Sequence, residues 1–190
     1  IVGLVVGLLV APRLTAVLLS ALVNCAMFTY VAFRFVVAMV GAQHEHVQAI
    51  RDDEVRALRD DELPMYTVLV PVYKEANVVG HLIENLRRLD YPHSKLEILL
   101  LIEEDDLETL HAAKAARPPE TVTFIVVPEG VPKTKPKACN VGLLFARGEF
   151  LTIYDAEDRP DPDQLKKAVI AFRKGSPELV CVQAALNYYN

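Results

Sequence analysis

The sequence lacks the residues and motifs that mark several common classes of protein. Its 190 residues include only three cysteines, Cys25, Cys139 and Cys181, too few and too scattered for a disulfide framework, so reduced thiols are expected. No Gly-x-Gly-x-x-Gly follows the first predicted strand, and no Gly-x-x-x-x-Gly-Lys-Ser/Thr occurs, which disfavours dinucleotide-dependent redox chemistry and a P-loop. The formal net charge is -5, so the charge balance does not indicate a nucleic-acid partner.

The apolar residues, 52% of the chain, are concentrated before residue 42. Residues 14–33 contain no charge, and at about 1.5 Å per residue such a run reaches about 30 Å, the thickness of the bilayer hydrocarbon. We therefore expect a transmembrane region over residues 1–42, with a helix over 14–41. Residues 1–11 are too short to span and are expected to be the end of an earlier helix, which makes a hairpin. A buried core helix is the alternative.

Residues 43–63 are strongly charged, with 3 basic and 7 acidic residues. Within them Val47, Ile50, Val55 and Leu58 are spaced as one face of a helix. This pattern predicts an amphipathic connecting helix that packs on the following domain. One arginine precedes the uncharged run and four follow it before residue 60, a weak bias toward a cytosolic position for that domain.

After residue 64, short apolar runs alternate with segments of helical periodicity. The expected strands are 65–72, 96–102, 122–127, 150–154 and 179–184, and the expected helices are 76–89, 107–116, 137–146 and 162–174. Nearly continuous apolar strands separated by helices indicate a mostly parallel sheet with helices on both faces. The predicted fold class is therefore α/β, of the doubly wound, Rossmann-like kind.

Three carboxylates follow the expected strand 150–154: Asp155, Glu157 and Asp158. The next helix is expected to begin at Asp161 or Pro162, so the carboxylates lie in the short loop where open α/β sheets bind ligands. Crowded carboxylates raise one another's pKa unless a cation neutralises them, and hard oxygen ligands around a nucleotide diphosphate suit Mg²⁺ or Mn²⁺. A solvated acidic turn is the alternative interpretation.

The other strand ends also carry polar side chains. Tyr73 is suited to stack on a base and Glu75 to accept its hydrogen bonds, although either also suits the start of a helix. An acidic stretch, residues 103–106, follows the second strand and equally suits the first turn of a helix. Lys137 lies in the first turn of a predicted helix, where the helix dipole disfavours a cation unless an anion is bound there. A solvated basic loop is the alternative for this lysine.

Four segments resemble, in order and spacing, the nucleotide-binding half of inverting family-two glycosyltransferases. They are Val-Pro-Val-Tyr-Lys-Glu at 70–75, Glu-Glu at 103–104, Lys-Ala-Cys-Asn-Val-Gly-Leu at 137–143 and Asp-Ala-Glu-Asp at 155–158. The likeness is greatest to membrane-embedded polysaccharide synthases of the cellulose synthase type. It implies a GT-A fold, with residues 64–190 as the donor-binding half, a UDP-sugar donor, Mg²⁺ or Mn²⁺, and a growing polysaccharide as acceptor. It also implies a multi-pass protein of the cell (inner) membrane with a cytosolic transferase domain.

The resemblance assigns five residues to the donor: Tyr73, Glu75, Glu104, Lys137 and Asp155, the last of which is also a metal ligand. Tyr73 and Glu75 correspond to uracil contacts, Glu104 to a nucleoside-binding acid and Lys137 to a diphosphate-binding lysine. Asp155 and Glu157 correspond to the Asp-x-Asp acids, with Glu157 as the metal ligand and Asp158 as a backup. The chain departs from the family pattern where Lys74 replaces Asn, Glu103-Glu104 replaces Asp-Asp and Glu157 replaces Asp.

The family's catalytic base is an aspartate in a Thr-Glu-Asp segment, and a Gln-x-x-Arg-Trp segment holds the acceptor. Neither occurs here, and the chain contains no tryptophan. We therefore expect a fragment that holds the donor half, with the base beyond Asn190. Two alternatives remain: a nucleotidyltransferase that makes an activated sugar, and an inert membrane protein that binds nucleotide sugars. Release of UDP would separate the transferase from the inert protein.

Overall fold

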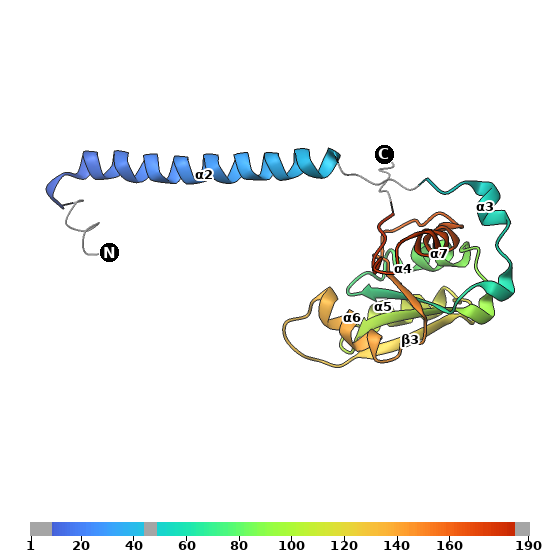
Figure 1. Cartoon of the computed structure of the whole chain (residues 1–190). Coiled ribbons are helices and arrows are strands. Elements are labelled where there is room, and N and C mark those ends of the chain that lie inside the picture. The colour runs from blue at the N-terminus through green and yellow to red at the C-terminus, as the bar shows by residue number, and fades with distance from the viewer. Residues whose placement is uncertain (1–8, 44–48, 185–190) are drawn as a thin grey trace. The chain divides into compact units, whose positions relative to one another are not determined.

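The structure, a computed structural model, describes residues 9–43 and 49–184, and the chain divides into two compact units, Ile1–Gln48 and Ala49–Asn190 (Figure 1). In the first unit, α2 (Pro12–Gln43) is one continuous helix of 32 residues. Within the described part of the chain, its stretch Pro12–Gly41 is long and apolar enough to cross a membrane, and none of it is buried. The helix predicted over 14–41 is therefore present, whereas most of residues 1–11 lie outside the described part.

The segment before the sheet differs from the single amphipathic helix predicted over 43–63. Its described part contains a five-residue helix, α3 (Asp52–Arg56), and a 3-10 turn, η1 (Asp60–Glu62), so that prediction is wrong. Each short element starts directly after an arginine and carries three acidic residues in its first turn. Acidic side chains are favourable in the first turn of a helix and unfavourable later in it. The two acidic triplets, residues 52–54 and 60–62, therefore begin two separate short elements and do not lie within one long helix.

This segment packs on the last helix of the second unit, α7 (Gln164–Lys174). Val55 and Leu63 are 7% and 2% exposed, and Lys174 forms an ion pair with Glu54. The pattern of apolar residues therefore predicted the packing of this segment correctly although it misjudged the helix length.

The second unit is built on a four-stranded parallel sheet of order β3-β2-β1-β4. Its strands are β1 (Tyr66–Val72), β2 (Leu96–Glu103), β3 (Val122–Val127) and β4 (Phe150–Ile153). The connecting helices are α4 (Val79–Arg87), η2 (His93–Lys95), α5 (Leu107–Ala115) and α6 (Lys135–Leu143), with α7 after β4. β1 and β2 are buried along their whole length, as near-continuous apolar strands of a parallel sheet should be.

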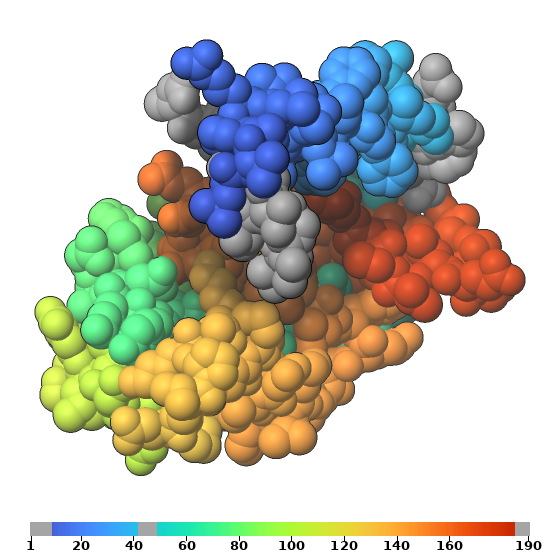
Figure 2. Space-filling model, turned by 90° about the vertical axis from the view of Figure 1, so that its left-hand side faces the viewer, coloured from blue at the N-terminus to red at the C-terminus, as the bar shows by residue number. Residues whose placement is uncertain are grey.

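Each face of the sheet has its own core. The larger core joins residues such as Val68, Val70 and Leu100 to α4 and α7, and the smaller joins Leu69 and Leu101 to α6. Helices therefore cover both faces, as predicted (Figure 1). Residues 128–145, yellow to gold in Figure 2, make up much of the surface of this unit in that view.

Two details of the predicted elements are corrected. No strand follows α7 within the described residues, although 179–184 was expected to form one. β4 is therefore an edge strand with Leu151 and Ile153 37% and 51% exposed, and Val180 in the unpaired segment is 88% exposed. α7 begins at Gln164 and not at 161 or 162, because the carbonyl of Pro162 accepts the N–H of Asp90 (2.8 Å).

Candidate functional site

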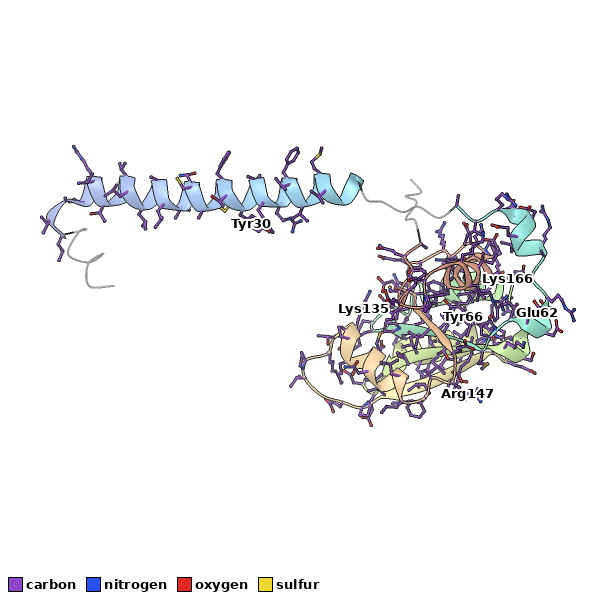
Figure 3. The ribbon with its side chains drawn as sticks, in the orientation of Figure 1. Tyr30, Glu62, Tyr66, Lys135, Arg147 and Lys166 are labelled. Atoms are coloured by element: carbon purple, nitrogen blue, oxygen red, sulfur yellow. The ribbon has the colours of Figure 1, made fainter. Side chains whose placement is uncertain are left out.

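The carboxyl ends of the four strands meet at one edge of the sheet, because the strands are parallel and paired in register. The segments that follow the strands at this edge are residues 73–75, 104–106, 128–134 and 154–158. Figure 3 labels Lys135, at the start of α6, and Tyr66, at the amino end of β1, which lie toward opposite ends of the sheet. The fold thus gathers the polar strand ends predicted from the sequence.

A glycine lets α6 approach the sheet closely and so sets the position of its first residues. A Cβ atom at Gly142 would lie 2.9 Å from the Leu101 side chain and 3.1 Å from that of Leu69. Leu69 and Leu101 are fully buried and cannot easily move aside. Close packing of α6 therefore holds Lys135 and the loop before it at the carboxyl edge.

The loop after β4 is a turn that keeps two carboxylates accessible. Tyr154 and Ala156 are buried, whereas Asp155 is partly exposed and Glu157 is exposed. Asp158 Oδ2 accepts the N–H of Asp155 (2.7 Å), and the N–H of Asp158 donates to the Asp155 carbonyl (3.0 Å). Asp158, the predicted backup metal ligand, therefore has one carboxylate oxygen engaged in holding the turn.

Glu75, Asp155 and Glu157 interact electrostatically around Lys135. The Lys135 Nζ lies 2.8 Å from Asp155 Oδ1, and this hydrogen bond raises the pKa of the lysine. Burial raises the pKa of Glu75; Asp155 and Glu157 raise it further, while a backbone hydrogen bond and Lys135 oppose the rise. Asp155 is thus the carboxylate paired with Lys135, while Glu75 and Glu157 act on the same lysine through their charge.

The donor set fits a metal that arrives with a phosphate ligand. The described residues contain no group of three or more His, Cys, Asp or Glu side chains that could hold a metal ion together. Mg²⁺ is usually bound through one or two carboxylates together with substrate phosphates, not by an all-protein cage. Asp155 and Glu157 supply two accessible carboxylates, which suits this second arrangement.

The loop after β1 is tied to the start of α5. Lys74 has a φ of 57°, and its N–H donates to Asp106 Oδ2. The other oxygen of Asp106 accepts the N–H of Thr109 at 3.1 Å, which caps α5, and the Thr109 hydroxyl accepts the N–H of Glu75 at 3.1 Å. These bonds hold the backbone directly after Tyr73.

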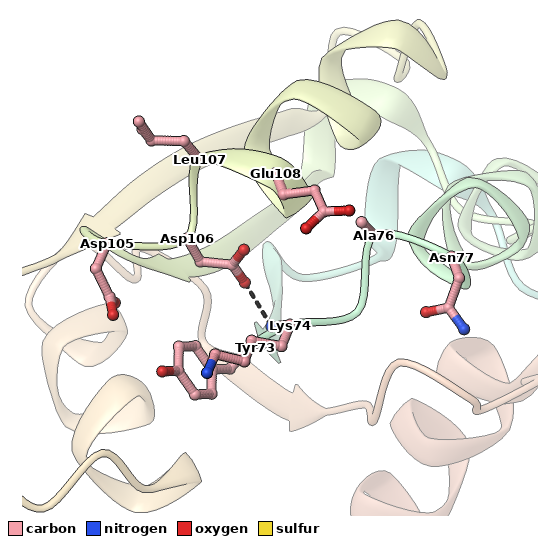
Figure 4. Close-up of a pocket in the computed structure, with 8 residues that line it drawn as sticks. All are labelled: Tyr73, Lys74, Ala76, Asn77, Asp105, Asp106, Leu107 and Glu108. Carbon is pink, nitrogen blue, oxygen red and sulfur yellow. Dashed lines mark hydrogen bonds between the residues drawn. The ribbon is translucent and has the colours of Figure 1, made fainter.

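An open pocket of about 450 Å³ lies between this loop and the start of α5 (Figure 4). It is lined by Tyr73, Lys74, Ala76, Asn77, Asp105, Asp106, Leu107 and Glu108. The ammonium groups of Lys74 and Lys133 lie 5.2 Å and 5.3 Å from the centre of the Tyr73 ring, within the range of cation–π attraction. Tyr73 therefore offers an aromatic ring at the edge of a pocket with charged side chains around it.

Glu104 and its neighbour Glu103 have different surroundings. Glu104 is exposed, and its Oε2 accepts the N–H of Glu129 at 3.1 Å, so this predicted nucleoside-binding acid contacts the segment after β3. Glu103 is only 5% exposed. Lys137, the predicted diphosphate ligand, places its Nζ 3.1 Å from Glu103 Oε2. The structure thus places Tyr73, Glu75 and the acids after β4 at the carboxyl edge of the sheet. Lys137 instead forms an ion pair with Glu103, the last residue of β2.

Sequence reasoning missed the parts played by Lys133 and Lys135. Lys133 forms an ion pair with Asp105, and Lys135 forms one with Asp155. The available signal was the alternation of lysines at 133, 135 and 137. That alternation indicated a basic loop, but it did not show which lysine meets which acid.

Comparison with known proteins shows the family. Residues 67–190 match glycosyl transferase family 2, and the chain belongs to that family. The match spans β1 to α7 and so covers the whole carboxyl edge described above.

Curated relatives share about a quarter of their aligned residues with this chain. The dolichyl N-acetyl-alpha-D-glucosaminyl phosphate 3-beta-D-2,3-diacetamido-2,3-dideoxy-beta-D-glucuronosyltransferase of Methanococcus voltae is 25% identical over 64% of this chain and 39% of that protein. The beta-monoglucosyldiacylglycerol synthase of Trichormus variabilis is 26% identical over 65% of this chain and 27% of that protein. The chain therefore spans well under half of the length of these relatives.

Among solved structures, the mannosyltransferase PcManGT of Pyrobaculum calidifontis, in complex with GDP-Man and Mn²⁺, is 30% identical. The match has a TM-score of 0.51 and covers 60% of this chain and 33% of that one. The likeness supports a GT-A fold for the second unit, with the apolar helix α2 ahead of it.

Proposed function

We propose that this chain is the donor-binding part of a membrane-bound, inverting glycosyltransferase. In this proposal a UDP-sugar is the donor, a growing polysaccharide is the acceptor, and the whole protein is a multi-pass enzyme of the inner membrane, similar to cellulose synthases. The family match supports transfer from a nucleotide sugar, and α2 supports an association with the bilayer. The GT-A relative that carries Mn²⁺ supports a divalent metal, Mg²⁺ or Mn²⁺.

One observation carries the proposal: at the carboxyl edge of a family-two sheet, Lys135 pairs with Asp155 at 2.8 Å, and the exposed Glu157 lies two residues further on. A carboxylate cluster with one accessible lysine suits a ligand that brings both phosphate and a cation, because each charge then acquires an opposite partner. The open pocket beside Tyr73 supplies room for a base next to that edge.

The residues have separate tasks in this proposal. Tyr73 stacks on the uracil, Glu75 accepts hydrogen bonds from it, and Glu104 holds the nucleoside. Asp155 and Glu157 hold the metal, which when bound neutralises the diphosphate and stabilises it as a leaving group. A lysine after β3 neutralises the remaining charge, and the family resemblance assigns this task to Lys137.

The proposal is tested with the full-length protein in detergent. UDP-glucose, UDP-N-acetylglucosamine and GDP-mannose are supplied in turn with Mn²⁺ and a glycan extract, and the released nucleotide is measured. We expect release of UDP that depends on the acceptor, together with incorporation of the labelled sugar into polymer.

Other results would contradict the proposal. Pyrophosphate formed from UTP and a sugar phosphate would identify a nucleotidyltransferase. Tight binding of donor without release or incorporation would indicate an inert nucleotide-sugar-binding protein. A higher rate with GDP-mannose than with either UDP-sugar would overturn the donor assignment while leaving the reaction class in place.

A further inference from the structure

The loop after β1 has an unfavourable backbone conformation at Lys74. Its φ of 57° lies in the left-handed region, which residues other than glycine, asparagine and aspartate rarely adopt. In the part of the chain that the structure describes, only Arg117 shares a positive φ. Arg117 directly follows the end of α5, where a left-handed residue is common. Lys74 follows a strand, so contacts with other elements must hold its conformation.

The first turn of α5 supplies these contacts. Asp106 accepts the N–H of Lys74 through Oδ2 and the N–H of Thr109 through Oδ1. The Thr109 hydroxyl accepts the N–H of Glu75 at 3.1 Å. Asp106 is 7% exposed and Thr109 is fully buried, so water cannot easily replace either acceptor. Two consecutive N–H groups of the loop therefore depend on two side chains of one helical turn.

Both oxygens of the Asp106 carboxylate are in use. Burial would raise the pKa of Asp106, but hydrogen bonds from the Lys74 N–H and from Thr109 outweigh that effect and lower the pKa. A carboxylate can serve Lys74 and Thr109 at once because it has two acceptor oxygens, whereas an amide has only one. A neutral residue could cap α5 in place of Asp106, but it could not also hold the loop.

The φ dihedral of Lys74 lies between the two residues that the proposal assigns to the base, Tyr73 and Glu75. Figure 4 shows Asp106 bonded to the backbone of Lys74, with the Tyr73 ring beside this bond at the edge of the open pocket. A change of this dihedral toward a negative value would turn Tyr73 relative to Glu75. The contacts of α5 therefore set how these two side chains are presented together.

We infer that Asp106 and Thr109 are positioning residues of the donor site, which hold Lys74 in the left-handed conformation that presents Tyr73 and Glu75 together to the nucleoside. The inference rests on the proposed function, in which Tyr73 and Glu75 bind the base. In this inference neither Asp106 nor Thr109 touches the nucleotide. The unfavourable conformation is imposed when the chain folds, so the nucleoside meets a loop that is already arranged.

The first test replaces each acceptor by a residue of similar shape. Asp106→Asn keeps a good helix cap but leaves one oxygen for two N–H groups, and Thr109→Val removes the hydroxyl. Each should weaken the binding of uridine about three- to thirtyfold, the effect of losing one buried hydrogen bond. Thr109→Ser keeps the hydroxyl and should bind uridine as the unaltered protein does. Glu97→Gln, at the opposite end of the sheet, is the control that lowers the melting temperature without changing the affinity for uridine.

The second test separates positioning from a general loss of stability. Lys74→Gly and Lys74→Ala both remove the ammonium group, but only glycine adopts a positive φ without strain. In the Asp106→Asn background, the glycine variant should therefore bind uridine about five- to thirtyfold more tightly than the alanine variant. With Asp106 intact, the carboxylate holds either residue, and the two variants should differ much less. A residue that only stabilised the fold would give the same ratio in both backgrounds.

The binding of uridine is measured by calorimetric titration of the full-length protein, with thermal unfolding of every variant. Uridine affinities of Asp106→Asn and Thr109→Val equal to that of the Glu97→Gln control would overturn the inference. So would equal ratios of the glycine and alanine variants in the two backgrounds. If the unaltered protein binds guanosine and not uridine, the donor assignment fails, and the same variants measured with guanosine still test the inference. If it binds neither nucleoside, the proposed function and the inference fail together.

Discussion

The Nε of Arg147 donates a hydrogen bond to Oε1 of Glu97 at 2.6 Å, at the end of the sheet opposite the candidate site. The other oxygen of Glu97 accepts the Thr67 hydroxyl at 2.8 Å and the N–H of Arg147 at 3.0 Å. The N–H of Gly148 in turn donates to the Thr67 hydroxyl at 2.8 Å. One network thus joins β1, β2 and the turn before β4, and it sets where β4 begins and where its loop lies.

Neutralising Glu97 should destabilise the fold. Glu97 is 5% exposed, and Glu97→Gln keeps its size but removes the charge from its bonds to Arg147, so we expect a loss of about 1.5 to 3 kcal/mol in the free energy of unfolding. Urea unfolding monitored by circular dichroism measures the loss. Glu120→Gln, at an exposed position, is the control, and equal stability of the two variants would show that the network contributes nothing.

The same carboxylate should make stability depend on pH. Burial alone would raise the pKa of Glu97, but hydrogen bonds from Arg147 and Thr67 outweigh it, and the pKa is lowered. A carboxylate whose pKa is lowered by folding stabilises the folded state. That stabilisation is fully present above about pH 4.3, the ordinary pKa of glutamate, and is lost as the pH falls through the pKa of the folded state. The difference in melting temperature between the unaltered protein and Glu97→Gln should hold from pH 7 to 5 and shrink below pH 4. A difference that is constant down to pH 3 would contradict this.

Two glycine-to-alanine substitutions should have opposite effects. A Cβ at Gly148 would lie 2.4 Å from the backbone nitrogen of Thr67, so Gly148→Ala should cost about 1 to 3 kcal/mol through forced backbone movement. Gly80 lies in α4 with no atom within 4 Å of the added Cβ, so Gly80→Ala should stabilise by about 0.5 to 1 kcal/mol. Thermal unfolding of both variants tests the pair, and the same sign of change in each would refute the steric argument.

Removal of either acid after β4 should weaken metal-dependent binding. Glu157→Gln and Asp155→Asn should each lower the affinity for UDP in the presence of Mn²⁺ about ten- to hundredfold, the loss of one charge-assisted contact. Titrations with Mn²⁺ and with excess chelator measure the metal-dependent part, with Glu178→Gln at an exposed position as control. If the unaltered protein bound UDP equally well with chelator, the metal assignment would be wrong.

The topology can be tested with thiol reagents. Cys181 is exposed, whereas Cys139 is 8% exposed and burial raises the pKa of its thiol, so Cys181 should react much faster. A membrane-impermeant maleimide should label Cys181 in inverted vesicles but not in intact cells. Cys181→Ser should abolish that labelling. Labelling of Cys181 from outside intact cells would place the second unit on the other side of the membrane.

Much of the fold was determined by local sequence. The apolar runs predicted β1 to β4 within about a residue, and the helices between them implied the parallel sheet that places Tyr73, Glu75 and Asp155 at one edge. The long uncharged run predicted α2. The strands and helices could be predicted because hydrophobic periodicity depends on residues that are close in the chain. The position of the three residues at one edge then follows from the geometry of a parallel sheet.

Only the tertiary structure decided which charges meet. Lys135 and Lys137 are two residues apart, yet one pairs with Asp155 after β4 and the other with Glu103 at the end of β2. Their partners lie 20 and 34 positions away along the chain, and the path of the loop in space selects them. Burial likewise distinguishes Glu103 from Glu104, because Glu103 is the last residue of β2, which is buried along its whole length, whereas Glu104 lies beyond the strand. The sequence therefore determined where the site lies, and packing determined the task of each charged residue in it.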